Sequence, residues 1–162
     1  MQILKWLVLA VTALSLLVLL AGQLGAFSGH APEYLGVRDG KLRAPSKTPN
    51  SVSSQADQWP QHPMRDEARI APLLLRGSGP ATIAQIRRIV EGMPGAQVVQ
   101  ARDDYLYVQF TTRWMKFIDD AEFWFDPAAS VVQVRSASRI GRKDFGANRE
   151  RIEAIRQALA GG

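Results

Sequence analysis

The residues from Gln97 to Ser138 alternate between apolar and polar side chains, which is the strongest constraint this sequence places on a fold. A period of two is the repeat of a β-strand, whose successive side chains point to opposite faces. Turn residues interrupt the alternation at Asp103–Asp104, at Lys116–Phe117 and over Asp126–Ser130. We therefore expect an antiparallel meander with strands near 97–102, 104–113, 119–126 and 130–138.

The register of this meander follows from keeping apolar side chains together, because a slip of one residue would move every side chain to the opposite face. This rule pairs Phe125 with Val132, Phe123 with Val134 and, across the turn at Lys116–Phe117, Phe110 with Phe123. The far face is then polar, and its predicted rows are Thr111–Glu122–Arg135, Gln109–Trp124–Gln133 and Arg113 opposite Asp120. Such a face is either ordinary cross-strand pairing or the floor of a polar site.

Two segments have the spacing of amphipathic helices. One carries Ile83, Ile86 and Val90, follows a cap at Ser78 or Thr82, and ends at 92–95; the other carries Ile152, Ile155 and Leu159. Asp144 or Asn148 is the expected N-cap of the second helix, since each offers a short acceptor to the first amides. With an edge strand at 70–75, these elements predict an α+β fold, a two-layer sandwich of a four- to five-stranded antiparallel sheet with two helices on one face.

The N-terminus is apolar enough to cross a bilayer. Between Trp6 and Leu20 there is no charged residue, and residues 3–26 approach the roughly 20 residues that a spanning helix needs. We expect residues 1–27 to form a transmembrane anchor in the inner (cytoplasmic) membrane, crossing once, with the rest of the chain on the periplasmic side. The alternative is a cleaved signal peptide and secretion to the periplasm.

A second region, residues 28–69, is rich in Pro and Ser and poor in large apolar side chains. Each proline removes a backbone donor, so regular structure is not expected here. The region is either a linker or an irregular arm packed on the domain, and turn-forming residues such as Asn50 favour the arm. Residues 70–162 are the expected globular domain.

The composition narrows the chemistry. The chain has a formal charge of +5 and no cysteine, which excludes disulfides and thiolate catalysis. Its two histidines, His30 and His62, show no metal-ligand spacing, and no cofactor motif is present, so we expect neither a metal nor a cofactor. Nucleic acid is not an expected partner of a membrane-anchored domain, despite the charge. The catalytic residues, if any, are unknown.

The most unusual polar stretch runs from Arg135 to Arg149 and combines arginines, serines and glycines. Arginine forks suit carboxylate and phosphate, and a helix N-terminus attracts anions. The structural alternative is that Arg135 pairs with Glu122 and Arg149 with Asp144. The candidate ligand-binding residues, including one from the arm, are Arg135, Ser136, Ser138, Arg139, Arg142, Asn148, Arg149, Glu122, Trp124 and Asn50.

Two motifs resemble a known family. The first motif is Pro49-Asn-Ser-Val-Ser-Ser54. The second has two parts, Val134-Arg-Ser-Ala-Ser-Arg139 and Asp144-Phe-Gly-Ala-Asn-Arg149. The chain resembles, over residues 35–159, the bacterial and plastid domain of unknown function family numbered 1499. Family members commonly carry cysteines in and before the first motif, where this chain has Ser51 and Pro45. The resemblance implies no substrate.

These observations favour a membrane-anchored envelope protein with a non-enzymatic binding or assembly domain. Its basic Ser/Arg/Gly loop is expected to bind an anionic ligand or an envelope protein. In an assembly role, the arm or a helix face would dock on a larger membrane complex. The alternative is a hydrolase-like enzyme that uses Glu122 with arginines or serines of the loop on a phosphoester or glycan.

Overall fold

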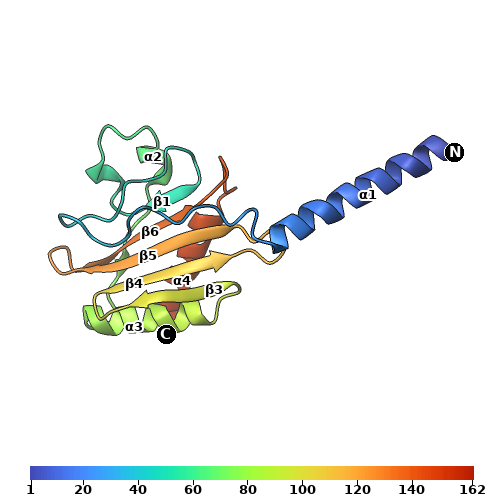
Figure 1. The fold of residues 1–162 in the computed structure, drawn as a ribbon. Helices are drawn as coiled ribbons and strands as arrows, with labels where there is room; N and C mark the ends of the chain where they lie inside the picture. Colours follow the sequence, from blue (N-terminus) through green and yellow to red (C-terminus); the bar gives the residue numbers. More distant parts are fainter.

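The computed structural model describes all residues, 1–162, as one sheet covered on both faces and one projecting helix (Figure 1). Its elements in chain order are α1 (Gln2–Gln23), β1 (Ser51–Ser53), η1 (Ala56–Gln58), α2 (Arg65–Ala68), β2 (Leu73–Leu74), α3 (Gly79–Glu91), β3 (Ala96–Ala101), β4 (Tyr105–Thr111), β5 (Ile118–Asp126), β6 (Val131–Ser138) and α4 (Ala147–Gly161). The predicted α+β class is confirmed.

The sheet has six strands in the order β1-β6-β5-β4-β3, with β2 also paired to β6. All the pairings are antiparallel. The count exceeds the expected four to five because the arm, residues 28–69, contributes β1 to the outer edge of β6. There Val52 lies opposite Ser136, while Leu73 of β2 lies opposite Val132 further along the same strand.

The helices α3 and α4 cover one face of the sheet and enclose the apolar core. Their stripes supply Ile83, Ile86, Ile152 and Ile155, all almost completely buried. The strands supply the opposing side chains Leu106, Val108, Phe110, Phe123, Val132 and Val134. The predicted inward faces are therefore confirmed. Ser78 caps α3, since its hydroxyl accepts a hydrogen bond from the amide of Ala81.

The register between β5 and β6 is the predicted one, with Phe125 opposite Val132 and Phe123 opposite Val134. The predicted pairing of Phe110 with Phe123 is wrong, because Phe110 lies opposite Asp119 and Phe123 lies opposite Leu106. The error comes from the loop. The turn was predicted at Lys116–Phe117, but the hairpin closes where the Thr112 amide donates to the Phe117 carbonyl, so the turn consists of residues 113–116 and its centre lies two residues earlier. The resulting shift is even, so each side chain keeps its predicted face.

The polar rows of the far face change accordingly. Glu122 lies opposite Arg135, as predicted, but its β4 neighbour is Tyr107 and not Thr111. Trp124 lies opposite Gln133, as predicted, with Tyr105 in place of Gln109 on its other side. Arg113 does not face Asp120, which lies between Gln109 and Ala137 in the sheet.

The arm packs over this polar face. Leu42 is buried with Tyr105 and Tyr107, and Leu35 and Val37 pack against the same cluster. The buried Gln55 joins two parts of the arm, because its side chain accepts a hydrogen bond from the Leu42 amide and donates one to the Gly40 carbonyl. The arm is therefore the second cover of the sheet, opposite the helices (Figure 1).

The start of α4 differs from the prediction. The expected N-cap was Asp144 or Asn148, but Gly146 occupies this position with φ at 91°, a left-handed conformation that favours glycine. Asp144 still satisfies the first amides from two residues earlier, since its carboxylate accepts from Gly146 N and Asn148 N. Burial alone would raise the pKa of Asp144, but the hydrogen bonds from Asn148 and Gly146 lower it below its usual value.

The N-terminal helix α1 projects away from the sheet and has no buried residue in its most apolar window. It is long and apolar enough to cross a membrane, and a signal sequence would have the same character.

Candidate functional site

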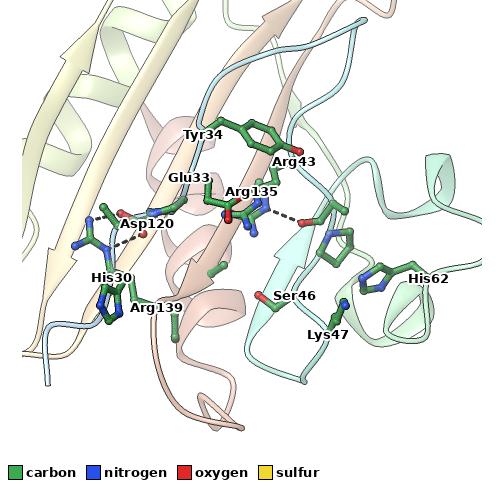
Figure 2. A pocket seen from close by; sticks show the side chains of 16 residues that line it. His30, Glu33, Tyr34, Arg43, Ser46, Lys47, His62, Asp120, Arg135 and Arg139 are labelled. Atoms are coloured by element: carbon green, nitrogen blue, oxygen red, sulfur yellow. Dashed lines mark hydrogen bonds and ion pairs between the residues drawn. The ribbon is translucent and has the colours of Figure 1, made fainter.

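A cavity of about 560 Å³ lies between the arm and the polar face of the sheet. The arm lines it with residues 30–34 and 43–47 and with His62, and the sheet lines it with Asp120 of β5 and with Arg135, Ala137 and Ser138 of β6. Arg139, directly after β6, completes the wall. Figure 2 shows the arm side chains of Tyr34 and Arg43 close to the guanidinium of Arg135.

Arg135 is the central side chain of this cavity, with only 4% of its surface exposed. Its Nε donates to the carbonyl of Ala44 in the arm over 3.1 Å. Its Nη1 lies 3.9 Å from Oε2 of Glu122, and neither atom has a hydrogen-bond partner. A buried guanidinium with an unused donor is costly, because five N–H groups left water and at least one gained nothing in return.

Glu122 lies behind Arg135 and is completely buried. Its Oε1 accepts from the Gly36 amide and from the Tyr105 hydroxyl, each over 2.7 Å. Burial raises the pKa of Glu122, while the Gly36 hydrogen bond and the charge of Arg135 act in the opposite direction. Burial likewise lowers the pKa of Arg135, opposed by the charge of Glu122. Desolvation therefore dominates both members of this pair.

A second ion pair forms another part of the wall. Arg139 binds Asp120 through two parallel hydrogen bonds of 2.9 Å, and the Tyr107 hydroxyl donates to the same carboxylate. The pKa of Arg139 is raised chiefly by its hydrogen bond to Asp120. Arg139, which the sequence left free for a ligand, is thus committed to a neighbour. Asp119 precedes Asp120 within β5 and is bound to Arg151.

Asn50, Ser136 and Asn148 do not line the cavity but form a buried network beside it. The side-chain amide of Asn50 donates to the carbonyls of Gly141 and Ser138. The amide of Asn148 donates to Asn50 O and Ser138 Oγ, and its carbonyl accepts from Ser136 and Arg151. This network joins the arm, β6 and α4, so these motif residues hold three elements together.

The remaining candidates lie elsewhere. Arg142 is exposed and makes no ion pair, and Trp124 lies at the Leu35–Val37 part of the arm. Arg149 does not pair with Asp144 but donates to the Glu67 carbonyl over 2.8 Å. Of the predicted set, the cavity therefore brings together Arg135, Ser138 and Arg139.

Sequence reasoning missed the contribution of the arm. Arg43 and Lys47 line the cavity and have no acidic partner within ion-pair distance, and His30, Glu33 and His62 lie around them. The available signal was the concentration of basic residues between Arg38 and Lys47, with Asp39 as the only acid. No group of three or more His, Cys, Asp or Glu side chains is placed to hold a metal ion.

Comparison with known proteins identifies a family. Residues 41–159 match the family described as Protein of unknown function (DUF1499). The chain belongs to this family. The resemblance inferred from the two motifs is confirmed, with the match beginning at Lys41 rather than Leu35. No curated protein and no solved structure matches the chain.

The DUF1499 match includes parts of both layers that cover the sheet, the arm on one face and the helices α3 and α4 on the other. It begins within the arm, so it includes β1 and the cavity residues from Arg43 to Lys47, and it ends in α4 at Leu159. The first motif supplies Asn50 and β1, and the second supplies β6 and the start of α4. The two motifs meet in the hydrogen bond from the Asn148 side chain to the Asn50 carbonyl, so they belong to one structural unit.

Proposed function

We propose that this protein is a membrane-tethered binding protein whose domain takes a small anionic ligand into the cavity under the arm. In this proposal α1 holds the chain in the inner membrane, and the domain lies on the periplasmic side within the cell envelope. The ligand carries a carboxylate or a phosphate, the two groups that a guanidinium fork binds best.

The observation that carries the proposal is the unsatisfied guanidinium of Arg135. Its Nη1 has no hydrogen-bond partner although the residue is buried and lines a cavity of about 560 Å³. Buried polar groups are nearly always satisfied, and an exception calls for a specific reason. Nη1 itself faces Glu122, but the only hydrogen bond of the Arg135 side chain is the one from Nε to Ala44, so an anion in the cavity would meet a positive charge with N–H groups still to be satisfied.

The charges around the cavity support an anion over a cation. Asp120 is neutralised by Arg139, and Glu122 faces Arg135 from behind. Arg43 and Lys47 then outnumber Glu33 among the remaining charged side chains of the wall. Arg43 also lies over the ring of Tyr34, with 5.3 Å between the guanidinium carbon and the ring centroid, which orients it without neutralising it.

Binding is favoured over hydrolysis by the position of Glu122. A general acid must come within hydrogen-bond reach of the reacting group. Glu122 has no exposed surface, does not line the cavity, and already accepts hydrogen bonds from Gly36 and Tyr105. Its raised pKa follows from this burial, so it does not by itself argue for catalysis.

The test is a titration of the full chain in detergent micelles with inorganic phosphate and with citrate, followed by calorimetry. We expect saturable binding of at least one of them. Arg43→Ala and Lys47→Ala each weaken the affinity by roughly three- to tenfold, which corresponds to about 1 kcal/mol. Neither side chain is fully buried or has an acidic partner, so the fold should tolerate their loss.

The matched control is Arg88→Ala, which removes the same charge from an exposed position on α3. This variant should bind like the wild type. If Arg88→Ala weakened the affinity as much as Arg43→Ala and Lys47→Ala do, the loss would follow from net charge alone. That result would overturn the assignment of the anion to the cavity. Absence of saturable binding for both anions would overturn the proposed function.

A further inference from the structure

The C-terminal end of α1 is attached to the loop between β4 and β5, residues 112–117. The side chain of Gln23 donates to the carbonyls of Arg113 (3.2 Å) and Trp114 (2.7 Å). Gly22 packs so closely on Met115 that an added Cβ would lie 3.1 Å from its backbone. Phe27 and Phe117 add an aromatic contact with 5.7 Å between ring centroids. These contacts fix the loop at the end of the helix.

The length of α1 places that end at a membrane boundary if the helix spans. Its 22 residues extend for roughly 33 Å at 1.5 Å per residue, close to the roughly 30 Å of a hydrocarbon core. The rest of the chain lies beyond one end of α1, none of it alongside the helix (Figure 1). Gln23 and the attached loop therefore lie at the level of the lipid headgroups.

The loop has the side chains of an interfacial surface. Trp114 is 61% exposed, and Leu24 of the helix end is 79% exposed. Large exposed aromatic and aliphatic groups at one spot need a reason in a folded domain, and tryptophan prefers the boundary between lipid and water. Arg113 and Lys116 flank Trp114, and neither has a carboxylate within ion-pair distance.

A cavity of about 650 Å³ opens beside this loop, separate from the one under the arm. Arg113, Lys116 and Arg151 line it together with Thr111, Thr112 and Met93. Arg151 is already bound to Asp119 and lies over the Phe110 ring at 4.4 Å. Arg113 lies over the Trp114 ring at 4.8 Å, a contact that leaves its charge unneutralised, so Arg113 and Lys116 are the two cations of this lining without a carboxylate partner.

We infer that this cavity, with the loop 112–117, binds the headgroup of an anionic phospholipid in the leaflet next to the domain. Arg113 and Lys116 contact the headgroup phosphate, and Trp114 and Leu24 lie against the upper acyl chains. The inference rests on the proposed function in one respect, which is that α1 spans the bilayer. It assigns a lipid site that is distinct from the anion site at Arg135.

The experiment uses the full chain in phosphatidylcholine vesicles that contain spin-labelled phosphatidylglycerol or spin-labelled phosphatidylcholine. The immobilised fraction of each labelled lipid gives the preference of the protein. We expect the wild type to prefer phosphatidylglycerol by a factor of about 25, since each of the two basic side chains near the headgroups contributes about a fivefold gain. Arg113→Gln/Lys116→Gln lowers the preference toward one.

Two controls separate this site from general effects. Arg88→Gln keeps the preference, and the charge-conserving Arg113→Lys/Lys116→Arg also keeps it, which shows that the loop remains folded. Equal immobilisation of the two lipids by the wild type would overturn the inference. A preference abolished by millimolar inorganic phosphate would assign the cavity to free phosphate and overturn the lipid as its ligand.

A nitroxide on Leu14→Cys, the sole cysteine in that variant, distinguishes failure of this inference from failure of the anchor. Oxygen accessibility typical of hydrocarbon, combined with no lipid preference, overturns the lipid site alone. A Leu14 label in water overturns the membrane anchor and the lipid site with it, while the anion titration of the Arg135 cavity is unaffected.

Discussion

At the scale of single residues, Gly95 shows how one backbone position controls the closure of the sheet. It lies between α3 and β3 with φ at +73°, where residues other than glycine are strained. Its carbonyl accepts from the Thr111 amide, and a Cβ at this position would collide with the Thr111 carbonyl oxygen. Glycine is therefore required twice, for its dihedral angle and for close approach.

We predict that Gly95→Ala lowers the free energy of unfolding by about 3 kcal/mol, because the strain of the left-handed conformation adds to the steric conflict. Chemical denaturation of the full chain in micelles measures the change. The control is Gly77→Ala, which has a similar φ of +79° but nothing near its added methyl group, and it should cost only about 1 kcal/mol. Equal losses would contradict the steric part of the argument.

At the scale of elements, β5 and β6 are joined by a charged pair as well as by their backbone ladder. Glu122 and Arg135 lie opposite one another, and both are almost completely buried. A buried pair of this kind contributes little net stability, but the loss of one member leaves the other as an uncompensated charge. The cost of each single variant should therefore exceed the cost that remains when both charges are gone.

A double-mutant cycle tests this coupling. We expect Arg135→Met to lower the free energy of unfolding by about 3 kcal/mol or more, since the Glu122 carboxylate loses its counter-charge. In Glu122→Gln/Arg135→Met the amide keeps an oxygen for Gly36 and Tyr105, so the double variant should be more stable than the sum of the single losses predicts, by at least roughly 1 kcal/mol. Additive losses would mean that the 3.9 Å separation carries no coupling.

At the scale of the whole molecule, the arm belongs to the cooperative unit of the domain. It supplies a strand to the sheet, and Val52 of that strand enters the main apolar core with 3% exposure. A segment that shares both backbone pairing and core packing is expected to unfold together with the rest. The cavity under the arm is then a permanent feature and not a gap between a domain and a loose linker.

We predict that Val52→Ala lowers the urea midpoint by the same amount whether unfolding is followed at Trp59 in the arm or at Trp124 in the sheet. The expected loss in the free energy of unfolding is roughly 2 kcal/mol, because the substitution removes buried methyl groups. Single-tryptophan variants of the full chain, with Phe at the other positions, provide the two probes. Leu74→Ala, at a 72% exposed position, serves as the control and should change neither midpoint appreciably. A shift at Trp59 alone would show that the arm unfolds separately.

The sequence by itself determined those features that local periodicity controls. Alternation at Phe123–Phe125 and Val132–Val134 set the buried face and the β5–β6 register, and the helical stripes of Ile83–Val90 and Ile152–Leu159 set the helix layer. Arg135 and Glu122 were brought together by the same reasoning, since two strands joined by a short turn leave few alternative registers.

Only the tertiary structure decided the hairpin before β5 and the composition of the site. The chain around Arg113–Phe117 carries no turn signal strong enough to place the turn at residues 113–116 instead of at Lys116–Phe117, because both positions keep the apolar face inward. The cavity depends on contacts between residues about ninety positions apart, such as Ala44 with Arg135, and no local pattern encodes such a contact. Irregular backbone has no period, so the place where the arm crosses the sheet is fixed by packing and buried hydrogen bonds alone.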